Sequence, residues 1–96
     1  MPKGYLVANI RVTEAEKFQT FSGMAAPAIA KYGGKVLARG PSADRHEGEL
    51  SGTVMMIEFK SKKAAETFYF SEEYQAAKAV RETCSDTDLM IIEEAE

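Results

Sequence analysis

Y-L-V-A-N-I-R-V, from Tyr5 to Val12, runs directly into T-E-A-E at residues 13–16, and this junction decides the fold. Every second residue of the first stretch, starting at Leu6, is apolar, while the residues between them are mixed. A period of two predicts a β-strand with one apolar face. Thr13 and Glu16 have the spacing of a capping box, which predicts that a helix begins here. The chain therefore opens with a strand followed at once by a helix.

Predicted strands and helices continue along the rest of the chain. We expect a helix up to Tyr32, ended by Gly33-Gly34, and then a strand over 35–40, a polar loop over 41–52 and a strand over 53–60. A second helix follows Ser61 and is punctuated by Ser71, a candidate start for a new turn, and a fourth strand covers 86–94. The order strand–helix–strand–strand–helix–strand predicts a single α+β domain over 1–96, of ferredoxin-like βαββαβ type. Its four-stranded antiparallel sheet would carry both helices on one face.

The other face of this sheet would be left open. By alternation we expect it to combine apolar and polar side chains: Tyr5, Val7, Asn9 and Arg11, then Leu37 and Arg39, then Met56 and Glu58, and finally Leu89 and Ile91. The assignment of the third strand could be inverted, because Met55, Ile57 and Phe59 are also apolar. An apolar patch of this size calls for a partner. We therefore predict a homodimer, a dimeric α/β barrel in which two sheets pack face to face.

Composition argues against a nucleic-acid-binding, a secreted or a membrane-spanning protein. The net charge of −3 and the lack of a dominant basic cluster disfavour nucleic-acid binding. Among the 96 residues there is one cysteine, Cys84, which favours a reducing compartment. The sequence has neither a signal peptide nor an apolar run long enough to span a membrane, so a cytoplasmic location is expected.

Several segments resemble a small bacterial family, the domain of unknown function numbered thirteen-thirty. They are M-P-K-G-Y at 1–5, K-Y-G-G-K-V-L-A-R-G at 31–40, I-E-F-K-S at 57–61, F-Y-F-S-E-E-Y-Q at 68–75, Arg81, and D-L-M-I-I-E at 88–93. The resemblance covers most of the chain in order and implies a dimeric α/β barrel of the ferredoxin-like class. It implies no particular reaction.

Two charged residues of the sheet are the first candidates for a site. Arg39, at the end of the second strand, could anchor a carboxylate or an enolate through a bidentate contact. Glu58, on the third strand, could act as a general acid or base if an apolar cavity raised its pKa. The alternative for both is a structural ion pair, either with each other or with another charged group.

Three further residues are weaker candidates. Asn9 could orient a bound carbonyl group and Tyr5 could line the cavity, but either could equally serve the interface. His46 is the single histidine of the chain and a candidate acid or base near neutral pH. A solvent-exposed histidine in the 41–52 loop is the alternative. No spacing of His, Cys or acidic residues indicates a metal site.

Two functions follow from these residues. The first is an enzyme that needs no cofactor and acts on a small organic acid or carbonyl compound, with Arg39, Asn9 and Tyr5 binding the substrate and Glu58 or His46 moving a proton. The second is a non-catalytic homodimer that binds a small molecule or is purely structural. An unpaired polar group facing the cavity would favour the first.

Overall fold

The computed structural model describes residues 2–40 and 43–95 of the chain. Pro41 and Ser42, which begin the predicted loop, lie outside the described residues. The elements are the strands β1 (Gly4–Val12), β2 (Lys35–Gly40), β3 (Thr53–Phe59) and β4 (Ser85–Glu93), and the helices α1 (Ala15–Lys31), α2 (Lys62–Tyr69) and α3 (Glu72–Cys84). Both the helices and the strands lie close to the positions predicted from hydrophobic periodicity.

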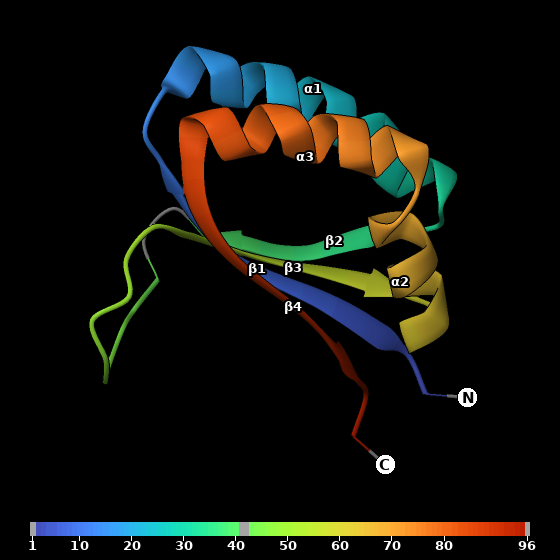
Figure 1. Cartoon of the computed structure of the whole chain (residues 1–96). Helices are drawn as coiled ribbons and strands as arrows, with labels where there is room; N and C mark the ends of the chain where they lie inside the picture. The colour runs from blue at the N-terminus through green and yellow to red at the C-terminus, as the bar shows by residue number, and fades with distance from the viewer. Residues whose placement is uncertain (1, 41–42, 96) are drawn as a thin grey trace.

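The four strands form one antiparallel sheet in the order β2-β3-β1-β4. Figure 1 shows α1 and α3 side by side above this sheet, with α2 at one end of it. All helices therefore cover the same face. This is the predicted ferredoxin-like arrangement, in which β1 and β3 occupy the centre.

The predicted second helix is two helices, so the described chain has three helices rather than two. Ser61 caps α2 by accepting a hydrogen bond from the amide of Ala64, at 3.0 Å. Ser71 starts α3 in the same way, with the amide of Tyr74 donating at 3.1 Å. Because the chain turns at Ser71, α3 can lie beside α1 while α2 closes the end of the sheet.

The start of α1 differs from the capping-box prediction. The helix begins at Ala15 after Glu14, without a side-chain cap. The amides of Thr13 and Glu14 instead donate to the carbonyl of Cys84, at 2.8 and 3.2 Å. This bond to the end of α3 replaces the local cap. At the other end of α1, Gly33 adopts φ +79°, which confirms the predicted glycine stop.

Strand register shows which side chains share a face. Leu6, Ala8 and Ile10 are buried beneath the helices, opposite Ile57, Met55 and Thr53 of β3. Met56 and Glu58 therefore lie on the open face, as predicted, opposite Val7 and Tyr5.

The assignment of β4 was wrong. Leu89 pairs with Ala8 and Ile91 with Leu6, so both lie on the helix-covered face and pack against the core. Met90 and Ile92 occupy the open face instead. All four residues of the run L-M-I-I are apolar, so the alternation of apolar and polar residues could not show which of them face the helices.

The assignment of Arg39 to the open face was also wrong. Lys35 pairs with Glu58 and Val36 with Ile57, but Ala38 then pairs with Met56, so Leu37 is an extra residue without a partner on β3. A β-bulge of this kind reverses the alternation beyond it. Arg39 consequently pairs with Met55 and turns toward the helices.

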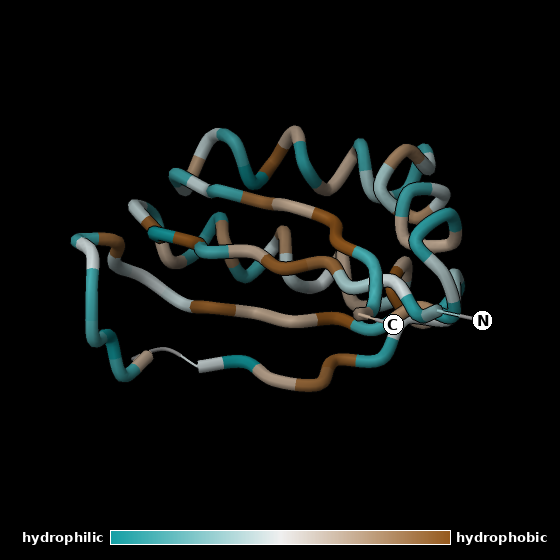
Figure 2. Tube along the Cα trace, turned by 90° about the horizontal axis from the view of Figure 1, so that it is seen from below, coloured by the Kyte–Doolittle hydropathy of each residue, from teal (hydrophilic) through white to brown (hydrophobic). Residues whose placement is uncertain are grey.

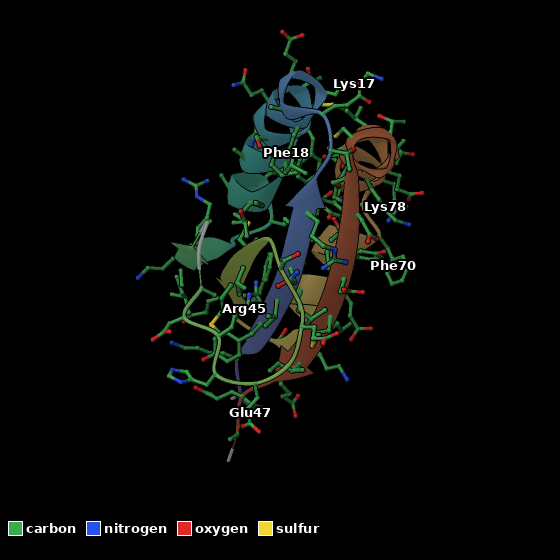
Figure 3. The ribbon with its side chains drawn as sticks, turned by 90° about the vertical axis from the view of Figure 1, so that its left-hand side faces the viewer. Lys17, Phe18, Arg45, Glu47, Phe70 and Lys78 are labelled. Atoms are coloured by element: carbon green, nitrogen blue, oxygen red, sulfur yellow. The ribbon has the colours of Figure 1, made fainter. Side chains whose placement is uncertain are left out.

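The open face carries a loop at one end. Figure 2 views the molecule from the sheet side, and Figure 3 shows the 43–52 segment crossing the strand ends, with Arg45 within its span and Glu47 near its far end. Arg45 Nη2 donates to Asn9 Oδ1 at 3.0 Å and to the Gly52 carbonyl at 3.1 Å. Among the described residues, no helix is long and apolar enough to cross a membrane.

Candidate functional site

A cavity of about 160 Å³ separates the sheet from α1 and α3. Its walls are mainly apolar, because they are the inward faces of β1, β3 and the two helices. Ser22, Ala26 and Arg39 line it and are exposed, which places its mouth between α1 and β2. Figure 3 shows Phe18, another lining residue, on the sheet side of α1, and Lys17 directed away from it.

The volume indicates the size of a ligand. An apolar cavity of about 150 Å³ accepts one benzene molecule. The present cavity is similar in size and opens toward solvent near Arg39, so a ring-sized molecule with a small substituent would fit.

The polar groups of the deeper wall come from α3. Tyr74, Ala77, Arg81 and Cys84 are the buried residues of this helix, and their spacing of three, four and three residues places them on one face. Tyr74 and Arg81 both line the cavity. A charged residue thus occupies a position where the helix would ordinarily carry an apolar one.

Arg81 is buried, with 6% of its surface exposed. Its Nη1 donates to the hydroxyl of Tyr74, and its Cζ lies 5.9 Å from the ring centroids of Phe21 and Tyr74. Within residues 2–40 and 43–95 no carboxylate pairs with it, and its buried Nε has no hydrogen-bond partner. A buried cation is normally paired, so this side chain has unused capacity for an anion.

Tyr74 shares this environment. Its ring packs against Phe68, Tyr69 and Phe21, and its hydroxyl accepts the bond from Arg81. Burial raises the pKa of the Tyr74 hydroxyl, and the neighbouring charge of Arg81 offsets this only in part. The hydroxyl therefore keeps its proton at neutral pH, and no described side chain accepts that proton in a hydrogen bond.

The structure divides the residues predicted for the site between two faces and a loop. Arg39 lines the cavity, whereas Tyr5, Asn9 and Glu58 lie on the opposite face of the sheet. Glu58 pairs with Lys3, Oε1 to Nζ at 3.3 Å, and not with Arg39. Asn9 Nδ2 donates to the Ser51 carbonyl, and its Oδ1 accepts from Arg45.

His46 lies in the exposed loop, where its Nε2 is 3.4 Å from Asp44 Oδ2. It does not meet Glu58 or Arg39 at a common site. In the described part of the chain, no group of three or more His, Cys, Asp or Glu side chains is arranged to hold a metal ion.

Sequence reasoning did not select Tyr74 or Arg81 as site residues. The signal was present, since the spacing that makes Tyr74, Ala77 and Cys84 one stripe also includes position 81. An arginine on the apolar stripe of an amphipathic helix is the pattern that identifies the site.

Comparison with known proteins gives a family match over residues 3–95, to the domain of unknown function DUF1330. No curated protein matches the chain significantly. The chain is similar in structure to a protein of unknown function from Rhodopseudomonas palustris, with a TM-score of 0.81, 17% identity, and coverage of 99% of this chain and 84% of the other.

Two further solved structures share the fold. One is a dimeric ferredoxin-like protein of unknown function from Jannaschia, with a TM-score of 0.72, 12% identity, and coverage of 98% and 99% of the two chains. The other is SnoaB, a cofactor-independent oxygenase from Streptomyces nogalater, with a TM-score of 0.71, 10% identity, and coverage of 100% and 96%. At these identities the likeness concerns the fold alone.

Proposed function

We propose that this chain, which belongs to the DUF1330 family, binds a compact organic acid or carbonyl compound in the cavity between its sheet and helices and acts on it without a cofactor. The observation that carries this proposal is the buried guanidinium of Arg81, which lines an apolar cavity and has no carboxylate partner among the described residues. A structural arginine in this position would be paired.

Arg39 has a supporting role in the proposed site. It lies at the mouth of the cavity and is exposed, so it can attract an anion but is screened by solvent. Arg81 is desolvated and can hold the anion strongly. The anion anchor predicted from the sequence is thus assigned mainly to Arg81, with Arg39 guiding entry. The proton-moving roles predicted for Glu58 and His46 find no support in this geometry.

The binding site can be tested with benzoate, a ring-sized carboxylate. NMR shift changes should map to the cavity around Phe21, Tyr74 and Arg81, and benzyl alcohol, which is uncharged, should bind at least about tenfold more weakly. Arg81→Met should remove that preference. If no ring-sized compound, charged or neutral, perturbs the cavity residues, the proposal is wrong.

Catalysis and simple binding are separate outcomes of this proposal. The similarity to a cofactor-independent oxygenase supports catalysis only at the level of the fold. Incubating the protein with phenolic and β-dicarbonyl compounds in air, followed by mass spectrometry, distinguishes the two. A product that forms with the wild type but not with Arg81→Met indicates an enzyme. Binding with no product indicates the alternative, a non-catalytic binding protein.

The open face of the sheet supports a second proposal, the homodimer. Met90 and Ile92 are 53% and 48% exposed there, beside Val7 and Tyr5 of β1. Figure 2 views the strands from this side and shows hydrophobic residues along them. The Jannaschia relative with the same fold is described as dimeric. A second copy of this chain, packed sheet against sheet, would cover these side chains.

A further inference from the structure

We infer that Tyr74 and Arg81 together form an oxyanion site, which selects ligands carrying a phenolate or enolate oxygen and holds that oxygen in its ionised form. The inference rests on the proposed function, because it names the chemistry of a ligand in the same cavity. It concerns two donors on one helix face, seven residues apart, both lining the cavity.

The first step is the state of the two donors. Arg81 spends one N–H of Nη1 on the Tyr74 hydroxyl, and its Nε has no partner in the described chain but is fully enclosed, so a ligand would meet the remaining N–H groups of Nη1 and Nη2. The Tyr74 hydroxyl uses its oxygen as an acceptor and leaves its proton available. An oxygen anion placed beside both groups would receive a neutral hydrogen bond from Tyr74 and a charge-assisted one from Arg81.

The second step is the direction in which the bond from Arg81 acts on Tyr74. A phenol whose oxygen accepts a bond from a cation becomes a stronger donor through its own proton. Burial raises the pKa of Tyr74, so this proton stays in place and is shared with the ligand. Tyr74 is therefore a hydrogen-bond donor to the oxyanion.

The third step is the absence of a strong base. Among the described lining residues of the cavity there is no Asp, Glu or His. A groove on the other side of Arg81 holds Glu82 and Asp86, but Glu82 pairs with Lys78 and Asp86 with Arg11. The ligand must therefore lose its proton to water. This condition selects acidic hydroxyl compounds, such as phenols and the enols of β-dicarbonyl compounds.

The test uses 4-nitrophenol, which is ring-sized and yellow only as the phenolate. Titrating its absorbance against pH, with and without saturating protein, measures its pKa in both states. We expect the bound probe to have a pKa lower by about one unit or more, equivalent to at least tenfold tighter binding of the phenolate than of the phenol. Tyr74→Phe should reduce this shift, and Arg81→Met should abolish it.

Lys63→Met is the control, because it removes a positive charge from an exposed position on α2 that lies outside the cavity. Its pKa shift should equal that of the wild type. Equal binding of phenol and phenolate by the wild-type protein overturns the inference, and the proposed function survives if benzoate still binds in the cavity. If neither probe binds, both fail. If Tyr74→Phe lowers the pKa of bound 4-nitrophenol as much as the wild type does, Tyr74 is not part of the oxyanion site.

Discussion

At the scale of single residues, the question is whether the buried Arg81 serves the stability of the fold or a function. A buried cation without a carboxylate destabilises the fold, and natural proteins tolerate such a cost mainly at functional sites. Its bond to Tyr74 and its contacts with the two rings compensate only in part. Stability measurements can therefore test a functional claim without a known substrate.

Arg81→Met should leave the free energy of unfolding unchanged or raise it by up to about 2 kcal/mol, because the isolated charge is removed and its volume is largely kept. Urea denaturation followed by circular dichroism measures this. A loss of about 2 kcal/mol or more would show that Arg81 serves the fold, and would contradict its role as an anion anchor.

Tyr74→Phe should alter the response of stability to alkaline pH. The pKa of Tyr74 is raised in the folded state, so its contribution is fully present below its ordinary pKa of 10.0 and is lost as pH rises through the folded value. At pH 8 the variant should be about 1 kcal/mol less stable, through loss of the bond from Arg81. Above about pH 10 the difference should shrink. Parallel pH profiles for the two proteins would contradict this account.

At the scale of elements, the start of α3 positions the site. The Ser71 hydroxyl is buried, accepts from the amide of Tyr74 and donates to the carbonyl of Phe68 at 2.6 Å. The same serine thus joins two helices and fixes the first turn of the helix that carries Tyr74 and Arg81. The Ser61 cap of α2 lacks this second, buried bond.

Ser71→Ala should therefore cost more than Ser61→Ala. We expect losses in the free energy of unfolding of about 2 and about 1 kcal/mol, because only the first substitution also removes a buried hydrogen bond to the Phe68 carbonyl, which then keeps the bond from the amide of residue 71 alone. Urea denaturation of both variants gives the comparison. Ser71→Ala should also broaden the NMR signals of Tyr74, and equal costs for the two serines would argue against this view.

The elements were predictable, but the orientation of two strands was not. In β1 the mixed residues Val7, Asn9 and Arg11 alternate with apolar ones, so its faces could be assigned from the sequence. In β4 the residues facing either side of the sheet are apolar, so the two faces look alike in the sequence. In β2 the extra residue Leu37 shifts the register with β3. Bulges depend on pairing with a neighbouring strand, and a single strand's sequence does not reveal them.

This limit explains why the sequence placed the candidate site on the open face of the sheet. Arg39 lines a cavity, but this cavity lies beneath the helices and not in the open face where Arg39 was predicted. The stripe of Tyr74, Ala77 and Cys84 can be continued through either position 80 or position 81. The structure shows that Arg81 is buried and Val80 only half-buried.

At the scale of the whole molecule, the proposed ligand site and the proposed dimer interface lie on opposite faces of the sheet. The cavity lies between the sheet and the helices of one protomer, and the apolar side chains on the other face are free to bind a second copy. The loop over 43–52 is attached to the open face at one end, through Arg45 and Asn9, so it borders the proposed interface. Ligand binding and dimerisation should therefore be separable by mutation.

Met90→Lys should convert the dimer to a folded monomer, because it places a charge within the proposed interface, where it would be buried without a partner. Light scattering on a sizing column should show the mass fall by half. Val12→Lys is the control. Val12 is 42% exposed, and the alternation of β1 places it on the helix-covered face of the sheet, away from the proposed interface. This variant should remain dimeric.

Because the cavity belongs to one protomer, the Met90→Lys monomer should still bind benzoate with an affinity within about threefold of the wild type. A wild-type protein that is monomeric at micromolar concentration contradicts the interface, whereas a monomeric variant that cannot bind benzoate contradicts the separation of the two faces.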